Sequence, residues 1–451
     1  MRGSLDSTSS APLTLCMEGN SSQDMLPEQL LDLAARSGAE AVEVFQSHSL
    51  SRPVYFEANR LKQLETSQVE GTALRLWRQG RPGLAVAYGD IEPQALIDKA
   101  LALSALNDPE EIELTPGSKL FYPDVGEAVS VELLVNWGES AITLIRQAYP
   151  DVLCEAELEC DIETTRIVTS KGLDCSYSDT TLSSYLSAEW VRGEDFLSVG
   201  DGQICRGCLD INHLADQILQ RLEWAEVNVS PPVGRIPILF TAKAADMLWA
   251  TVQAALSGKR VIERSSPWRD RIGEQVTSAA LTLSQNPEAG PFSCPFDDEG
   301  TPTQPLVFIE NGILRLFYTD RTIGRKLGRG STGNGFRPGL GSYPTPSLFN
   351  TLIKPGTQSL PTLIASLDEG LVVDQMLGEG TGISGEFSVN VELGYRVKQG
   401  NILGRVKDTM VAGNVYTALQ NLVELGGDAD WNGSCYTPSL IVEDLSTTGK
   451  Q

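Results

Sequence analysis

The chain contains only two histidines among its 451 residues, His48 and His213. Histidine is the usual proton carrier near neutral pH and the commonest zinc ligand, so this scarcity restricts the ways in which the protein could act as a hydrolase. The two residues lie far apart in the sequence, and their spacing matches no metal-binding motif. We expect both to be ordinary surface or helix-capping residues.

Long apolar runs and positive charge are scarce as well. No run of 18 apolar residues and no signal-peptide pattern occur, and the formal net charge is -24. An acidic surface repels phosphate backbones, so we expect no direct nucleic-acid binding and no membrane association. One local basic patch is a solvated face or a partner-docking surface: Arg321, Arg325, Lys326, Arg329 and Arg337.

Cysteine is too sparse for a disulfide scaffold, with eight residues in the chain. We therefore expect a cytoplasmic protein with reduced thiols. Cys205 and Cys208 form a lone CxxC pair, and no second pair at zinc-site spacing accompanies it. Structural thiols are the expected role of this pair.

The length predicts two or three domains, and strands followed by helices without strict alternation predict an α+β fold. Residues 1–22 are polar and expected to be frayed, and residues 23–226 form an α+β region. A strands-then-helix module is repeated there, at about residues 41–106 and 154–225. Residues 227–235 contain two prolines and form a linker, and residues 236–451 form a β-rich, glycine-punctuated C-terminal domain.

Three local predictions depend on hydrophobic spacing alone. Val54–Leu64 is predicted as one strand, Cys154–Glu163 and Arg166–Thr169 as two separate strands, and Gly413–Leu425 as the last helix. A further helix is predicted over Thr241–Arg260. Its apolar stripe follows i, i+3, i+4 spacing: Ala244, Met247, Leu248, Thr251, Val252 and Ala255.

Three segments carry groups that could do chemistry. Ser331–Gly335 is a glycine-rich run whose backbone N–H groups could hold an anion or an extended peptide, or simply form a tight loop. Asp297–Glu299 is an acidic triplet that could bind Mg²⁺ or share a proton, although a solvated loop is the commoner outcome. Cys435 could be a nucleophile only if a histidine came near it.

Several segments in order resemble one known family. Asp297–Asn350, Arg271–Ser278, Gly378–Ile402 and Met410–Leu422 resemble the TldD/PmbA family, which is named for a "modulator of DNA gyrase" and contains metallopeptidases. Stretches of the N-terminal part, such as SGAEAVEVF and FEANRLKQLE, resemble the first domain of that family. The resemblance covers nearly the whole chain.

The resemblance implies a choice between two branches. TldD-like members carry a zinc site on an HExxxH helix together with a C-terminal cysteine, whereas PmbA-like members, also called TldE, lack the histidine pair. In this chain the motif positions fall on Trp249, Ala250 and Ala254, none of which can bind zinc or act as a base. Cys435 resembles the remaining ligand position, so we expect a remnant, with no metal and no cofactor.

The resemblance thus predicts a non-catalytic PmbA/TldE-like subunit of a cytoplasmic metalloprotease complex, inactive as a peptidase alone. Its partner would be a TldD-like zinc peptidase subunit, or a second copy when the chain is isolated, and its substrates extended peptides. Two alternatives stay open: a regulator that binds gyrase or another protein, and a metal-dependent or cysteine-dependent peptidase acting alone. Peptide-binding candidates are Ser331, Thr332, Gly333, Asn334, Gly335, Gly385, Glu386 and Phe387.

Overall fold

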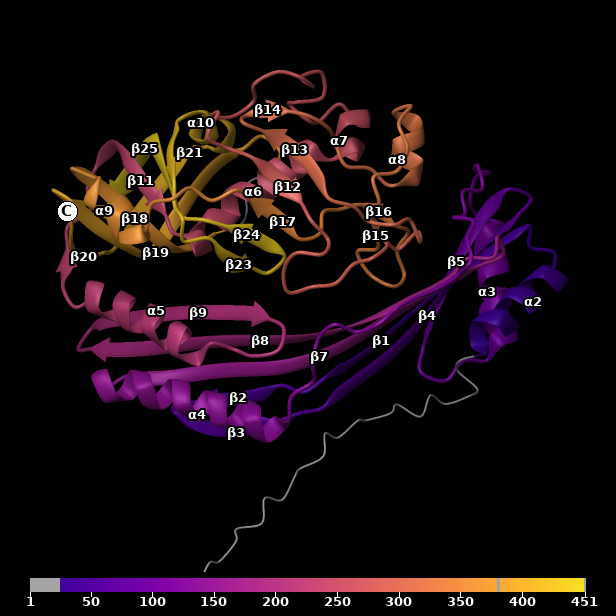
Figure 1. Ribbon diagram of the computed structural model, residues 1–451, viewed down its shortest axis with the longest axis horizontal. Coiled ribbons are helices and arrows are strands. Elements are labelled where there is room, and N and C mark those ends of the chain that lie inside the picture. Colours follow the sequence, from indigo (N-terminus) through magenta and orange to yellow (C-terminus); the bar gives the residue numbers. More distant parts are fainter. Residues whose placement is uncertain (1–24, 379–381, 450–451) are drawn as a thin grey trace, which may run out of the picture.

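The computed structural model describes residues 25–378 and 382–449. The segment 1–22, which the sequence predicts to be frayed, lies outside these residues. Figure 1 shows two parts: a long twisted sheet formed by the N-terminal half, and a β-rich part that covers one face of that sheet. The expected α+β class is confirmed.

Two very long strands, β7 (Leu153–Thr169) and β8 (Asp174–Arg192), form the centre of the N-terminal sheet. β7 begins with buried Cys154, Ala156 and Leu158 alternating with exposed glutamates, the period-2 pattern of a strand with one covered face. The remaining strands of this nine-stranded sheet are β1 (Ala41–Ser51), β2 (Val54–Glu57), β3 (Arg60–Leu64), β4 (Ser67–Arg78), β5 (Arg81–Tyr88), β6 (Lys119–Tyr122) and β9 (Asp195–Cys205).

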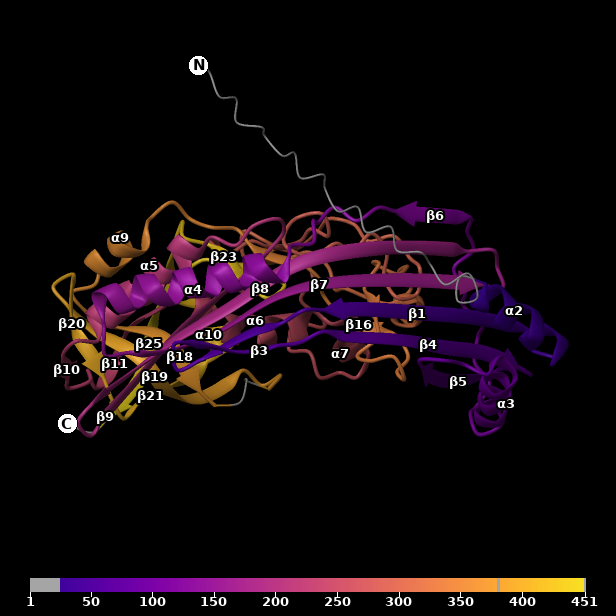
Figure 2. The same ribbon diagram turned by 90° about the horizontal axis from the view of Figure 1, so that it is seen from below.

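The pairing pattern explains the length of the sheet. One edge of β7 is shared by β1 and β2, while β8 pairs along the whole other edge. The far edge of β8 is shared in turn by β6 and β9. Because shorter strands follow one another along β7 and β8, the sheet is as long as these two strands. It extends from one end of the molecule to the other (Figure 2).

Four helices cover the two ends of this sheet. α2 (Leu26–Arg36) and α3 (Pro93–Ser104) pack together at one end, and α4 (Val131–Ala148) and α5 (Ile211–Trp224) pack together at the other (Figure 2). Side chains cap three of these four N-termini: Glu92 accepts the N–H of Gln94, Ser130 that of Leu133, and Asp210 that of His213.

The C-terminal part contains an eight-stranded sheet that closes on itself. β18 (Glu369–Leu377), β19 (Glu386–Lys398), β21 (Thr409–Asn414), β25 (Leu440–Gly449) and β11 (Gly234–Phe240) pair in a ring. The other strands of this sheet are β10 (Asn228–Val229), β20 (Asn401–Val406) and β22 (Leu422–Leu425).

A second, six-stranded sheet completes the C-terminal part. Its order is β14 (Ile313–Leu314), β13 (Leu306–Glu310), β12 (Leu283–Gln285), β17 (Thr351–Ile353), β24 (Cys435–Thr437) and β23 (Asp430–Asn432). A small pair joins β15 (Gly335–Phe336) to β16 (Thr345–Pro346). The helices are α6 (Ala242–Leu256), α7 (Gly258–Ile262), α8 (Arg321–Lys326), α9 (Leu360–Ala365) and α10 (Val415–Gln420).

Three local predictions were wrong in detail. Val54–Leu64 is a hairpin, because Ala58 and Asn59 adopt positive φ between β2 and β3. The two segments predicted between Cys154 and Thr169 are one continuous strand, because β8 pairs with all of it. The predicted helix Gly413–Leu425 divides into the end of β21, the short α10 and β22. The two ends are strands because β21 pairs with β19 and β22 pairs with β25.

Among residues 25–378 and 382–449, no helix combines the length and the apolar character that crossing a membrane requires.

Candidate functional site

Helix α6 carries the three positions that correspond to the zinc motif in the resemblance. Thr241 caps the helix by accepting the N–H of Ala244. Trp249 is fully buried, and its indole Nε1–H donates a hydrogen bond to Thr437 Oγ1 at 2.7 Å. Ala250 is exposed and Ala254 is half-buried. The first motif position is therefore filled by a packed indole ring bonded to β24.

Cys435 lies on the neighbouring strand β24, directly opposite Thr351 of β17. Its side chain is buried, and burial raises the pKa of the thiol to about 12. A thiol that stays protonated at neutral pH is a poor nucleophile. Together with an indole and two methyl groups, it makes a donor set that does not fit zinc.

The two histidines lie elsewhere. His48 is on β1, with its Nε2 atom 3.7 Å from Glu70, and His213 is in the first turn of α5. Within the residues that the structure describes, no group of three or more histidine, cysteine, aspartate or glutamate side chains is arranged to hold a metal ion. We therefore derive no chemical step through a metal in this chain.

The acidic triplet Asp297–Glu299 is not a solvated loop. Asp297 is fully buried and its carboxylate accepts three backbone N–H groups, those of Glu299, Thr301 and Gly335. Glu299 accepts a hydrogen bond from the N–H of Arg321 at 2.9 Å. Burial raises the pKa of Asp298 to about 6 and that of Glu299 to about 8. The three N–H donors lower the pKa of Asp297 relative to that of Glu299, so Asp297 is the member of the pair that ionises more readily.

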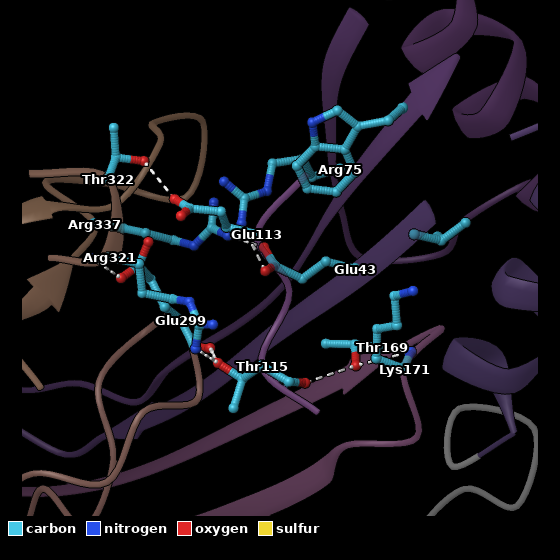
Figure 3. Close-up of polar contacts among 12 residues, drawn as sticks. Glu43, Arg75, Glu113, Thr115, Thr169, Lys171, Glu299, Arg321, Thr322 and Arg337 are labelled. Atoms are coloured by element: carbon cyan, nitrogen blue, oxygen red, sulfur yellow. Dashed lines mark hydrogen bonds and ion pairs between the residues drawn. The ribbon is translucent and has the colours of Figure 1, made fainter. Parts of the chain in front are cut away.

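A buried ion-pair network joins this region to the N-terminal sheet. Glu43 of β1 binds Arg75 of β4 at 2.7 Å and Arg337 of the C-terminal part at 2.6 Å, and Figure 3 shows both guanidinium groups directed at its carboxylate. Arg321 Nη1 donates to Thr115 Oγ1 at 2.7 Å in the same interface. These contacts connect the two parts of the molecule, and the side chains of the Glu43 ion pairs are almost completely buried.

Contacts between the two parts also involve most side chains of the predicted basic patch. Arg337 is buried against Glu43, and Arg325 binds Glu111 and Glu113. Arg321 faces Thr115. Lys326 and Arg329 are exposed. Three of the five basic side chains thus serve contacts between the two parts of the molecule.

A cavity of about 950 Å³ lies between the two parts, beside the N-terminal end of α6. Its walls come from β8, the end of β9, α5, the start of α6 and the segment that contains β23. Lys243 of α6 lines it and donates to the carbonyl oxygen of Gly200 and to Gln375 Oε1. His213, Cys205 and Cys208 line it as well. Both cysteines are free thiols, and burial raises the pKa of Cys205.

Comparison with known proteins identifies the fold. Residues 233–449 match the PmbA/TldA metallopeptidase C-terminal domain, and residues 42–104 match the PmbA/TldA metallopeptidase domain 1. The chain belongs to the TldD/PmbA family. The resemblance found in the sequence is therefore confirmed.

Relatives within the TldD/PmbA family align over half of the chain or more. The metalloprotease PmbA of Escherichia coli O157:H7 is 27% identical over 446 residues, 93% of this chain and 94% of the relative. A TldD homologue from Haemophilus influenzae is 31% identical over 231 residues, 50% of this chain and 47% of the relative. The crystal structure of TldE from Thermococcus kodakarensis superposes with a TM-score of 0.87 at 25% identity, covering 94% of this chain and 100% of that one.

The first peptide-binding candidate of this TldD/PmbA chain, Ser331–Gly335, is tied into the interior. Asn334 is fully buried and its Nδ2 donates to Gln285 Oε1 at 2.6 Å, while the N–H of Gly335 donates to Asp297. Thr332 Oγ1 accepts the N–H of Thr319 at 2.7 Å. Several of the groups expected to hold a peptide thus serve internal contacts, and the peptide role of this segment stays a prediction.

The second candidate, Gly385–Phe387, lies at the start of β19, on a different sheet from β15. Glu386 and Phe387 already pair with β21, and Phe387 is buried. Gly385 has a φ of +77° and lies against the ring of Tyr416, which explains the glycine. Part of the related segment Gly378–Phe387, residues 379–381, lies outside the described residues. The structure places the two candidates apart, and the role of the second also stays a prediction.

Sequence reasoning singled out His213, Cys205 and Cys208 but missed most of the other residues that line the cavity, Lys243 and Asp430 among them. The segment Gly426–Gly433 held a usable signal, because two aspartates and a tryptophan between glycines are typical of a functional loop. Without the structure, nothing indicated that this loop faces β9, which lies more than 200 positions earlier.

The buried carboxyls predict an unusual pH dependence. The pKa of Glu299 rises from 4.5 to about 8 on folding, so the folded state holds a proton that the unfolded state releases between these values. Stability is therefore greatest below pH 4.5 for this group and declines as pH rises toward 8, by up to about 1.4 kcal/mol per pH unit. Urea unfolding of Glu299→Gln across pH 5–9 should show a smaller decline than the parent chain.

A matched control for this experiment is Glu288→Gln, which changes an exposed carboxyl of the same C-terminal part. It should leave the pH dependence of the parent chain unchanged. Equal pH dependence of Glu299→Gln and the parent chain would show that Glu299 is ionised in the folded protein.

Proposed function

We propose that this chain is the non-catalytic, PmbA/TldE-like subunit of a metalloprotease complex, in which it helps to bind and present unfolded peptides to a zinc-bearing TldD-like partner. The observation that carries the proposal concerns the first zinc-motif position, which lies on helix α6. The buried indole of Trp249 occupies that position and donates a hydrogen bond to Thr437. A complete scaffold that lacks the chemistry of its relatives suits a supporting subunit better than an independent enzyme.

We also propose that the protein is located in the cytoplasm. The seven cysteines that the structure describes are all free thiols, as a reducing compartment favours. The alternatives receive less support. Buried Cys435 does not suit a cysteine peptidase. For a regulator, the acidic charge of -24 argues against DNA as the target, though not against gyrase or another protein.

The test is co-expression with a TldD-like chain followed by peptidase assays. We expect the two chains to purify together and the complex to cleave unfolded peptides at least severalfold faster than the TldD-like chain alone. This chain alone should cleave no peptide, because its motif positions provide neither ligand nor base.

The matched control places Glu→Gln in the HExxxH motif of the partner, which should abolish cleavage by the complex without preventing assembly. Residual cleavage in that control would assign activity to this chain instead. Failure to co-purify, or equal cleavage by the partner alone, would remove the basis of the subunit role.

A further inference from the structure

Strand β9 presents a free edge to the cavity. Gly200 shows which backbone groups of β9 point away from β8. The N–H of Gly200 donates to Gln375 Oε1 at 3.0 Å and its carbonyl oxygen accepts from Lys243, so both groups are directed away from β8. In an antiparallel ladder the outward direction recurs at every second residue. The register of β8 and β9 is unbroken from Arg192–Asp195 to Leu182–Cys205. Gly202 and Ile204, which line the cavity, therefore also direct their backbone groups outward.

Such an edge binds a further strand through main-chain hydrogen bonds. The N–H of Gly202 is held by its neighbour Asp201 at 2.8 Å. Because every second residue of β9 directs its backbone groups outward, the carbonyl oxygen of Gly202 and both backbone groups of Ile204 face the cavity. β9 pairs only with β8 among the described strands, so no strand covers this stretch. An extended peptide can add here without displacing an existing ladder.

The cavity walls around this edge are acidic. Four aspartates line the cavity against two cationic side chains: Asp201, Asp210, Asp428 and Asp430 against Arg221 and Lys243. Arg221 is already neutralised, because it binds Asp201 at 2.8 Å and fully buried Asp374 at 2.9 Å. The balance of charge therefore favours a cationic ligand.

Asp430 is the best-placed carboxylate for such a ligand. It is exposed at the start of β23, on the wall that approaches β9, and it accepts a hydrogen bond from the N–H of Trp431. Trp431 also lines the cavity.

We propose that this cavity binds an extended peptide segment bearing a lysine or arginine side chain, with its main chain on the edge of β9 at Gly202–Ile204 and its cation at Asp430. The inference deepens the proposed function, on which it rests, by naming the class of peptide. Because side chains alternate along a strand, every second residue of the peptide faces the acidic wall and the others point away.

The test measures binding of labelled peptides to the purified full chain alone by fluorescence anisotropy. The peptides are short valine- and threonine-rich segments that differ only at the central residue, which is lysine, norleucine or glutamate. A charge-assisted hydrogen bond contributes enough that the lysine peptide should bind about tenfold more tightly than the norleucine peptide. The glutamate peptide should bind most weakly.

Two variants separate the charge from the strand edge. Asp430→Asn should remove the preference for lysine and leave binding of the norleucine peptide unchanged, and Asp216→Asn, an exposed aspartate of α5 away from the cavity wall, is its control. Ile204→Pro removes one outward N–H without breaking the ladder to β8, so it should weaken all three peptides. Ser198→Pro has the same outward direction outside the cavity and should bind like the parent chain.

The outcomes distinguish this site from the subunit role. Equal binding of the lysine and norleucine peptides, or no binding of either, overturns the inference. Binding as expected but without stimulation of a TldD-like partner overturns the subunit role and leaves the site. Stimulation that persists while the chain binds no peptide overturns the site and leaves the subunit role. Thermal unfolding of each variant confirms that it is folded.

Discussion

Trp249→Ala is expected to lower the free energy of unfolding by about 3–5 kcal/mol, the usual cost of removing a large buried aromatic side chain. Trp249 has no exposed surface, and it packs in the apolar core of the C-terminal part. The substitution also removes the donor to Thr437. Urea unfolding followed by circular dichroism measures the loss.

Two further variants divide this loss into its parts. Trp249→Phe keeps most of the ring and removes the N–H donor, so it should cost about 1–2 kcal/mol. Ala250→Ser changes the exposed neighbouring motif position and should stay within about 0.5 kcal/mol of the parent chain. If Trp249→Ala cost less than about 1 kcal/mol, the ring would not be part of the core, and the first zinc-motif position would be open space.

The expected effect of Trp249 bears directly on function. At the position where the resemblance puts a zinc ligand, this chain has a side chain that stabilises the fold. Restoring a histidine there would exchange packed apolar surface for a polar ring, so the site is not one substitution away from a metal site. The absence of a zinc-ligand side chain at this position and the stability of the C-terminal part are linked through the same residue.

Spacing along the sequence predicted helix α6 but only part of its buried surface. The predicted stripe included Leu248 and Val252, which are fully buried, but not Trp249. An apolar stripe with this spacing predicts a helix that is covered on one face only. α6 contacts strands of both C-terminal sheets as well as α10, so it is covered on more than one face. Which faces are covered depends on partners that local spacing does not reveal.

Strand boundaries show the same limit. The sequence indicated strands in the region of β7 but divided that strand in two, because the polar residues Thr164 and Thr165 interrupt the apolar alternation. In the folded protein that stretch is held by pairing with β1 on one edge and β8 on the other. Ladder pairing with distant strands therefore overrides a locally weak pattern.

The acidic triplet was the least predictable part of the site. Three adjacent carboxyls are normally solvated, because burying charge is costly. Here each carboxyl group accepts a backbone N–H from a distant position: Asp297 from Gly335, Asp298 from Arg337 and Glu299 from Arg321. Nothing in Asp297–Glu299 alone reveals those donors, so only the three-dimensional structure shows that the triplet is an interior element.

Glu43→Ala is expected to destabilise the chain by about 3–5 kcal/mol, since it leaves buried cations without their counter-ion. The carboxylate of Glu43 is only 2% exposed, and it binds Arg75 and Arg337 through its two oxygens. Arg337 has one other carboxylate contact, through its backbone N–H to Asp298, and its guanidinium lies over the ring of Phe45. Urea unfolding at neutral pH measures the effect.

Because Glu43 joins the N-terminal sheet to the C-terminal part, its loss should also loosen the contact between them. We expect faster hydrogen exchange in β15 and in the segment around Thr115, measured by mass spectrometry, while exchange in β18 and β11 stays unchanged. The control is Glu111→Ala, which removes an exposed partner of Arg325 at the same interface and should cost no more than about 1 kcal/mol. Equal effects of Glu43→Ala and Glu111→Ala would mean that the buried network adds nothing beyond a surface ion pair, and the contact between the two parts would then rest on apolar packing alone.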